Sequence, residues 1–168
     1  MRKNQERIER GAVGMAYTIV DLLDKFISLE QAGQDMFMGI TGRKDVQHKI
    51  KTMAKIFANQ EKKHIEIYQT LKAKLEKEPE TEIDFFIYDK ISAAIFQYAG
   101  ISRVVGTESP KSLLEFCLNF EKDNLALLLS IQDIFSKAET DTNAVNIKLI
   151  SEIIFEEQKH VKNLEAFM

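Results

Sequence analysis

The feature that most constrains the fold is the scarcity of helix breakers inside long stretches of regular apolar spacing. Residues 44–77 contain neither glycine nor proline, and the whole chain of 168 residues has only seven glycines and two prolines. Apolar residues recur at intervals of three and four, which is the period of one face of a helix. Glycine and proline are the residues that most disfavour a helix interior. The pattern therefore predicts an all-α chain.

Turn signals separate two long helices in the first half of the chain. The first helix is expected from about Ala16, with a frayed extension from residue 4, to the glycines of "GITGRK". The second is expected over about 44–77, and "EPET" with Pro79 ends it. Next comes an apolar segment interrupted by charges, residues 83–106. We expect it to form an extra helix that covers the bundle or packs on a partner subunit.

The second half carries two further long helices. Ser109 and Pro110 form a helix start, with the hydroxyl group as N-cap and the proline in the first turn, and this helix is expected to end near Lys137. Asp141 or Thr142 caps the last helix, which continues to the C-terminus. Four long helices with one long middle connection predict a four-helix bundle in which the second and third main helices run parallel. No linker divides the chain, so we expect residues 1–168 to form one domain.

Charge and cysteine content restrict the classes of partner. The balance of 23 basic and 26 acidic residues gives a net charge of -3, which leaves no basic face for nucleic acid. The single cysteine, Cys117, excludes a disulfide framework within the chain and suits a reducing compartment. No stretch of about 20 apolar residues is available to span a bilayer. We therefore expect a cytoplasmic protein that binds neither nucleic acid nor a membrane.

The N-terminus superficially resembles a secretory signal peptide, because four basic residues precede "GAVGMAYTIV". However, Asp21 and Asp24 interrupt the apolar run, and no small-x-small cleavage site follows. Leu22, Leu23 and Phe26 continue the run at helical spacing. We interpret this segment as part of the first helix.

Two copies of a Glu-x-x-His motif lie on apolar stripes. In "IFANQEKKHIEIYQTL", Glu61 and His64 share a helix face with Phe57. In "IIFEEQKHVKNL", Glu157 and His160 repeat the motif. A charged group and an imidazole therefore occupy two positions where an apolar core is expected.

Each of the other two long helices carries one glutamate in its apolar stripe. Glu30 lies between Phe26 and Phe37, and Glu121 follows Cys117 by one turn. Each half of the chain thus consists of a Glu helix followed by a Glu-x-x-His helix. A bundle of two such hairpins can bring all six polar side chains to one level of its core.

Four converging carboxylates need a source of positive charge. Even one unpaired buried carboxylate costs several kcal/mol, whereas two divalent cations would balance four glutamates and two neutral imidazoles would complete the ligand sets. Carboxylate and imidazole ligands suit iron or manganese, although ligand type does not exclude zinc. The predicted roles are two bridging carboxylates, Glu61 and Glu157; two terminal carboxylates, Glu30 and Glu121; and one imidazole per metal ion, from His64 and His160.

This ligand set resembles that of the rubrerythrin family, in the ferritin-like superfamily, and the resemblance extends over all four long helices. "LEQAG" with Phe37, and "FEKDN" before a Leu-rich run, are similar to the motifs of that family's first and third helices. The resemblance implies a ferritin-like bundle with two iron ions in a non-haem centre. It also implies an oxidoreductase that reduces hydrogen peroxide or oxygen in defence against oxidative stress. We expect a homodimer.

The chain departs from the family at two points. Full-length rubrerythrins carry a rubredoxin domain whose four cysteines hold one iron, and this chain has one cysteine, so an external donor such as a rubredoxin-like protein is expected. Asn124 stands where the family has an additional glutamate, which argues against ligand switching and efficient peroxide reduction. A ferroxidase, or an iron-binding or iron-storage protein, is therefore the alternative function. An oxygenase acting on an organic substrate is a weaker alternative.

Haem and a storage shell are not expected. Lys62 follows Glu61 where a haem-binding bacterioferritin has methionine. The extra apolar helix between His64 and Glu121 resembles rubrerythrin-like proteins more than cage formers. Storage in a mineral shell is therefore the less favoured reading.

Several nearby residues are assigned smaller roles. Gln60 and Glu156 each lie four residues before a predicted ligand histidine, and we consider that they orient its second ring nitrogen. Tyr68 and Cys117 are interpreted as core residues rather than parts of the site. His48 is interpreted as a surface residue.

Overall fold

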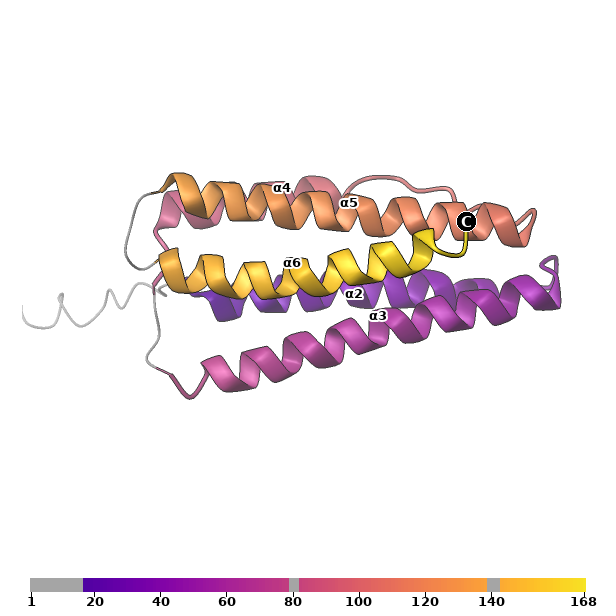
Figure 1. Cartoon of the computed structure of the whole chain (residues 1–168), viewed down its shortest axis with the longest axis horizontal. Coiled ribbons are helices and arrows are strands. Elements are labelled where there is room, and N and C mark those ends of the chain that lie inside the picture. The colour runs from indigo at the N-terminus through magenta and orange to yellow at the C-terminus, as the bar shows by residue number, and fades with distance from the viewer. Residues whose placement is uncertain (1–16, 79–81, 139–142) are drawn as a thin grey trace, which may run out of the picture.

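The computed structural model describes residues 17–78, 82–138 and 143–168, which contain five α-helices (Figure 1). The helices are α2 (Ile19–Thr41), α3 (His48–Leu75), α4 (Phe85–Ala99), α5 (Pro110–Lys137) and α6 (Asn143–Glu165). The prediction of an all-α bundle is confirmed. The predictions that lie outside the described residues are the extension from residue 4, the start near Ala16, the stop at Pro79 and the caps at Asp141 or Thr142.

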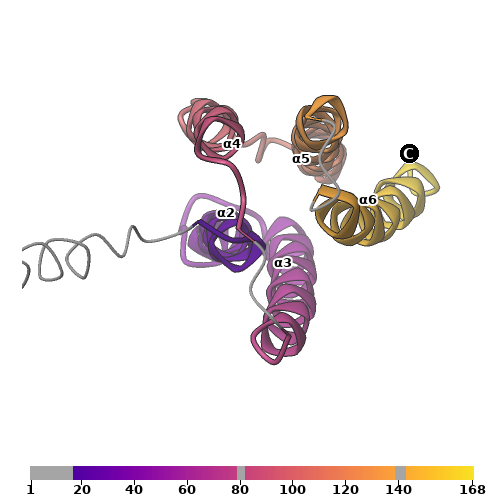
Figure 2. The same cartoon turned by 90° about the vertical axis from the view of Figure 1, so that its left-hand side faces the viewer.

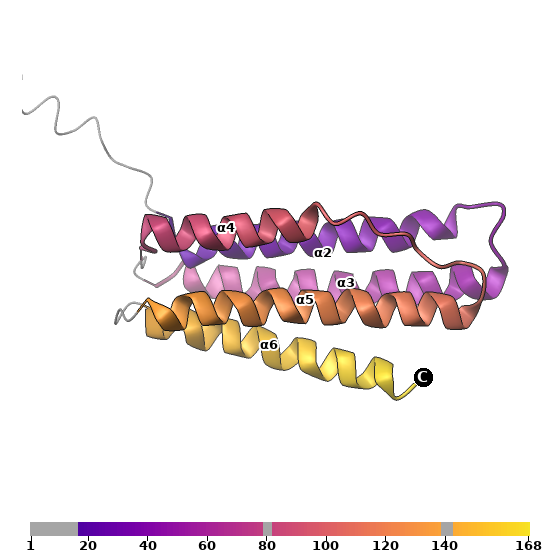
Figure 3. The ribbon, with the colours of Figure 1, turned by 90° about the horizontal axis from the view of Figure 1, so that it is seen from above.

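The four long helices pack as two antiparallel hairpins, α2 with α3 and α5 with α6, and these are the two most closely packed pairs. The chain crosses between the hairpins through α4 and an extended connection, which leads to the opposite end of the bundle before α5 begins (Figure 3). The helices α3 and α5 consequently run in the same direction, as predicted for the second and third main helices. Viewed along the bundle, α4 lies beside α2 and α5 (Figure 2).

Side-chain caps fix the starts of two long helices. The Thr18 backbone N–H donates to Asp21 Oδ2 at 2.7 Å ahead of α2. The Ser109 hydroxyl oxygen accepts from the Ser112 backbone N–H at 3.0 Å, and Pro110 occupies the first turn of α5. The start predicted for this helix is confirmed.

The extra helix is shorter than the predicted segment 83–106. It ends at Ala99, with Gly100 as its C-cap, and the chain then continues in a non-helical conformation. The β-branched residues Val104 and Val105 favour extended backbone. Val104 is exposed, whereas Val105 packs against the core. This alternation suits a strand-like connection better than another helical turn.

The limits of α3 also differ slightly from the prediction. The helix begins at His48 rather than Lys44, because residues 43–46 form the turn after α2. It ends at Leu75 rather than Lys77. Such differences of a few residues are typical of helix ends.

The core consists of two apolar clusters, and each long helix carries its glutamate between a residue of one cluster and a residue of the other. The flanking pairs are Phe26 and Phe37 around Glu30, Tyr68 and Phe57 around Glu61, Leu128 and Cys117 around Glu121, and Ile153 and Val161 around Glu157. We call the four glutamates, together with His64 and His160, the polar layer. We call the cluster that contains Phe26 the first cluster and the one that contains Phe37 the second cluster.

Among the helices in the described ranges, none combines the length and the apolar character that crossing a membrane requires.

Candidate metal centre

All six residues predicted as metal ligands are buried. Each is at most 8% exposed, and Glu61 and Glu121 are not exposed at all. Every long helix contributes: Glu30 from α2, Glu61 and His64 from α3, Glu121 from α5, and Glu157 and His160 from α6. The predicted set is therefore brought together at one level of the core.

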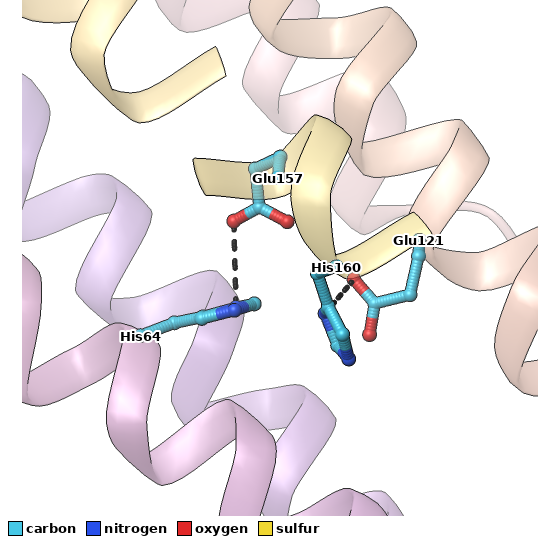
Figure 4. Close-up of side chains that lie close together, drawn as sticks. All are labelled: His64, Glu121, Glu157 and His160. Atoms are coloured by element: carbon cyan, nitrogen blue, oxygen red, sulfur yellow. Dashed lines mark ion pairs between the residues drawn. The ribbon is translucent and has the colours of Figure 1, made fainter. Parts of the chain in front are cut away.

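The two imidazoles face carboxylates. The Nδ1 atom of His64 lies 3.4 Å from Glu30 Oε2 and 3.4 Å from Glu157 Oε1. The Nδ1 atom of His160 lies 3.5 Å from Glu121 Oε2. Figure 4 shows the second and third of these contacts, and both histidine rings point into the space between α3, α5 and α6. The side chains thus converge from helices that are distant in the sequence.

The ligand atoms form two overlapping groups that are compact enough to hold metal ions. One group is Glu30, Glu61 and His64, and the other is His64, Glu121, Glu157 and His160. Within each group the nearest ligand atoms lie within 4.8 Å of one another. The buried side chains can therefore hold a metal ion.

Many oxygen and nitrogen atoms of the polar layer have no hydrogen-bond partner, which leaves their lone pairs free to bind a cation. Both carboxylate oxygens of Glu61 and of Glu121, Oε2 of Glu157 and both ring nitrogens of His160 are buried without a hydrogen-bond partner. Such buried groups ordinarily have partners. Within the described residues, no lysine or arginine forms an ion pair with any of the four glutamates. A bound cation would supply the missing partner, so the residues fit a metal.

Two neutral side chains support the carboxylates from outside. The Tyr68 hydroxyl group donates to Glu157 Oε1 at 2.8 Å, and the Asn124 amide donates to Glu30 Oε1 at 3.1 Å. Both donors are buried, at 3% and 5% exposure. The sequence predicts a core role for Tyr68 and marks Asn124 only as a departure from a family motif. Their positions one turn after His64 and Glu121 were the available signal.

The protonation of the layer reflects burial and crowding of like charges. Burial, with repulsion by Glu121 and Glu30, raises the pKa of Glu61 well above its usual value. Burial also raises the pKa of Glu157 to about 8, against the opposing effect of His64. Burial alone would lower the pKa of His64, but its contacts with Glu30 and Glu157 raise it to about 9. Without a cation the layer therefore holds protons near neutral pH, and metal binding would release them.

Glu30 behaves differently from its neighbours. Burial acts to raise its pKa, but hydrogen bonding to His64 and to Asn124 favours the ionised form and lowers the pKa below its usual value. A carboxylate that is already ionised requires no proton release before it binds a cation.

A glycine in α2 makes room for the layer. A Cβ atom at Gly33 would lie 3.1 Å from Phe120 Cζ and 3.3 Å from Glu61 Oε2. The absence of a side chain therefore lets α3 and α5 bring these groups close to α2. Gly33 sits one turn after Glu30, in the apolar stripe of its helix.

The smaller predictions have mixed outcomes. The carboxylate of Glu156 pairs with Lys159 at 3.0 Å, and no hydrogen bond joins Gln60 to His64 within the described residues, so neither orients a histidine. Cys117 is fully buried in the second cluster, and burial raises the pKa of its thiol, as suits a core residue. His48 is exposed, as predicted.

Comparison with protein-family models, with curated proteins and with solved structures finds no match. The polar layer, a buried group of glutamates and histidines that can hold a metal ion in an all-α bundle, is therefore the feature that points to function.

Proposed function

We propose that the protein is a non-haem di-iron oxidoreductase similar to rubrerythrin, which reduces hydrogen peroxide or oxygen with electrons from a separate donor. One observation carries the proposal: four buried carboxylates and two imidazoles converge, and many of their polar atoms have no hydrogen-bond partner. Leaving such groups buried without a partner costs several kcal/mol. A positively charged cofactor at this level would offset that cost.

Two ions suit the layer better than one. The ligand atoms fall into two groups of three and four residues, and together the groups use all six side chains. Two divalent cations carry the charge that balances four ionised glutamates. A set of one Glu from each of two helices and Glu-x-x-His from the other two is the pattern of di-iron carboxylate bundles.

The ligand chemistry favours iron or manganese over zinc, because carboxylates outnumber imidazoles and no thiolate belongs to either group. Glu61 and Glu157 would bridge the two ions, Glu30 and Glu121 would be terminal ligands, and His64 and His160 would each bind one ion. Reduction of one hydrogen peroxide molecule to two waters takes two electrons and two protons, and a bound pair of ferrous ions is a source of two electrons.

The surrounding protein would shield this chemistry from bulk water. The apolar clusters lie on both sides of the layer, and every ligand is at most 8% exposed. The chain has one cysteine, so it lacks the four thiolates of a rubredoxin-type iron site. We propose that electrons come from a separate donor protein, that the reaction takes place in the reducing environment of the cytoplasm, and that the working assembly is a homodimer.

One observation favours a ferroxidase as the second candidate. Asn124 occupies the position of the extra rubrerythrin glutamate, and its amide is engaged by Glu30 at 3.1 Å. A neutral amide cannot replace a carboxylate that moves onto a metal. In this alternative, ferrous iron is the substrate, and ferric iron is the product that leaves or is stored.

The test is stopped-flow oxidation of the anaerobic ferrous protein by hydrogen peroxide and by oxygen, with bound iron measured before and after. We expect two irons per chain, faster oxidation by peroxide than by oxygen, and ferric iron that stays bound and can be reduced again. Faster oxidation by oxygen with release of ferric iron would favour the ferroxidase instead.

Two matched variants distinguish the loss of a metal ligand from a general effect of substitution in α3. Glu61→Gln should lose rapid oxidation, whereas Glu66→Gln, whose side chain on the same helix is 61% exposed, should behave as the parent protein. Normal iron binding and oxidation by the Glu61→Gln variant would overturn the proposal. Particle size adds a further check, because a dimer argues against a storage shell.

A further inference from the structure

We propose that the two metal positions are not equivalent, and that the position at His64 fills first and more tightly because Tyr68 and Asn124 hold its carboxylates in place. This inference rests on the binding of two metal ions in the proposed function. It adds an order of filling and two positioning residues.

A continuous chain of polar contacts surrounds His64. It runs from the Tyr68 hydroxyl group to Glu157 Oε1 at 2.8 Å, and from there to His64 Nδ1 at 3.4 Å. The same Nδ1 atom lies 3.4 Å from Glu30 Oε2, and Glu30 Oε1 accepts from the Asn124 amide at 3.1 Å. The five residues come from α2, α3, α5 and α6, so all four long helices fix the geometry at this position.

The ligands around His160 lack comparable support. Its two ring nitrogens and both oxygens of Glu121 have no hydrogen-bond partner, and the one close contact between them is 3.5 Å. Glu61, which groups with Glu30 and His64, also has no partner for either oxygen, so the contrast is between Glu30 and Glu157 beside His64 and Glu121 beside His160. His160 and Glu121 therefore have no hydrogen bond that would orient them before an ion arrives.

Pre-oriented ligands bind metal more tightly, because less side-chain freedom is lost on binding. Outer hydrogen-bond partners of metal ligands are typically worth a factor of about 10–100 in affinity. A carboxylate oxygen has two lone pairs, so an oxygen that accepts from tyrosine or asparagine still has one for a metal ion. Tyr68 and Asn124 can therefore orient Glu157 and Glu30 without blocking them.

The experiment is a titration of the metal-free protein with cobalt(II), followed by visible absorption and by competition with a chelator. We expect two ions per chain in two separate steps, with the first at least about tenfold tighter than the second. His160→Gln should keep the tighter step, and His64→Gln should lose it. The visible spectrum of the first ion reports its ligand set and does not depend on catalytic activity.

Two variants with matched controls test the positioning residues. Asn124→Leu should weaken the first step by about 10–100-fold and change its spectrum, while the second step stays within about threefold, because Glu30 is a terminal ligand of the first ion only. Tyr68→Phe should weaken the first step by a similar factor, and the second step by a smaller one, because Glu157 bridges the two ions. Tyr98→Phe and Asn146→Leu serve as controls, because Tyr98 and Asn146 are also buried but their polar atoms have no hydrogen-bond partner. The controls should titrate as the parent protein does. Circular dichroism and a thermal melt confirm that each variant is folded.

The possible failures are distinguishable. Binding of fewer than about one ion per chain would contradict the proposed function together with this inference. Two ions in equal steps, or in one cooperative step, would overturn the inference alone. The same holds if Tyr68→Phe and Asn124→Leu change the first step no more than the controls do.

Discussion

The four long helices carry the polar layer and most of the two apolar clusters, but the layer and the clusters contribute to folding in opposite ways. Phe37 and Leu128 are buried among apolar neighbours, where removal from water stabilises the fold. Glu61 is equally buried, yet neither of its oxygens has a hydrogen-bond partner. The helices could therefore pack through the clusters alone, and the layer is costly without a cation. This contrast points to the layer as the functional part of the molecule.

The largest effect is expected from truncating the second cluster. Phe37 is fully buried and its ring packs against those of Phe57, Phe116 and Phe120. Phe37→Ala should lower the free energy of unfolding by about 3–5 kcal/mol, measured by urea denaturation. Phe155→Ala, at a site that is 60% exposed, should change it by less than about 0.5 kcal/mol. Equal effects of the two changes would show that the cluster does not form the core.

Replacing a glutamate of the polar layer by an apolar residue should raise the free energy of unfolding rather than lower it. Glu61→Leu removes an unpaired buried carboxylate, so it should raise the unfolding free energy of the metal-free protein by about 1–4 kcal/mol and abolish binding of two irons. Glu66→Leu, on the exposed face of α3, should leave iron binding intact. A strongly destabilised Glu61→Leu protein would contradict the view that the layer is costly without metal.

Two glycines of α2 differ in how closely other side chains approach them, so they test the packing beside the polar layer. Gly33→Ala should destabilise the protein by about 1–3 kcal/mol and weaken iron binding, since the new Cβ atom would crowd Phe120 and Glu61. Gly39→Ala should stabilise it by about 0.5–1 kcal/mol, because nothing lies within 4 Å of that Cβ position and alanine favours helix. Chemical denaturation of both variants is the measurement. A stabilising Gly33→Ala would mean that the close approach of α2, α3 and α5 is absent.

The metal-free protein should lose stability as the pH rises. The folded-state pKa of Glu157 is raised from 4.5 to about 8 and that of His64 from 6.5 to about 9. Groups with raised pKa values stabilise most below their unfolded pKa, and this contribution is lost as the pH rises through the folded value. The unfolding free energy should fall by at least about 1 kcal/mol between about pH 5 and about pH 9.

Iron loading should reverse this trend, because ionised carboxylates and neutral imidazoles bind metal best. Thermal melts of the two forms across this pH range give the comparison. Glu157→Gln removes one of the titrating groups and should flatten the metal-free profile. Stability of the metal-free protein that rises with pH would contradict the assignment of raised pKa values to the layer.

The fold and the six candidate ligands were accessible from sequence for a clear physical reason. Helical period, caps and breakers act over a few residues, so the four long helices follow from local patterns. A glutamate in the middle of an apolar stripe conflicts with burial, and the conflict recurs at Glu30, Glu61, Glu121 and Glu157. The occurrence of a glutamate within the apolar stripe of all four long helices is the pattern that predicts the polar layer.

The supporting contacts were not accessible in the same way. Tyr68 and Glu157 are 89 residues apart, and Asn124 and Glu30 are 94 residues apart. Whether such pairs meet depends on how the helices rotate about their axes, which no local pattern determines. The end of α4 was also missed, although Gly100 marks it, because apolar residues continue beyond that glycine at Ile101, Val104 and Val105.

Anaerobic equilibrium dialysis can count the ferrous ions bound by the polar layer in the parent protein, in His64→Gln and in His48→Gln. Both histidines belong to α3, but His64 lies in the polar layer and His48 is exposed. We expect two ions for the parent and for His48→Gln, and fewer than two for His64→Gln. Fewer than about one ion in the parent protein, or two in His64→Gln with undiminished affinity, would contradict it.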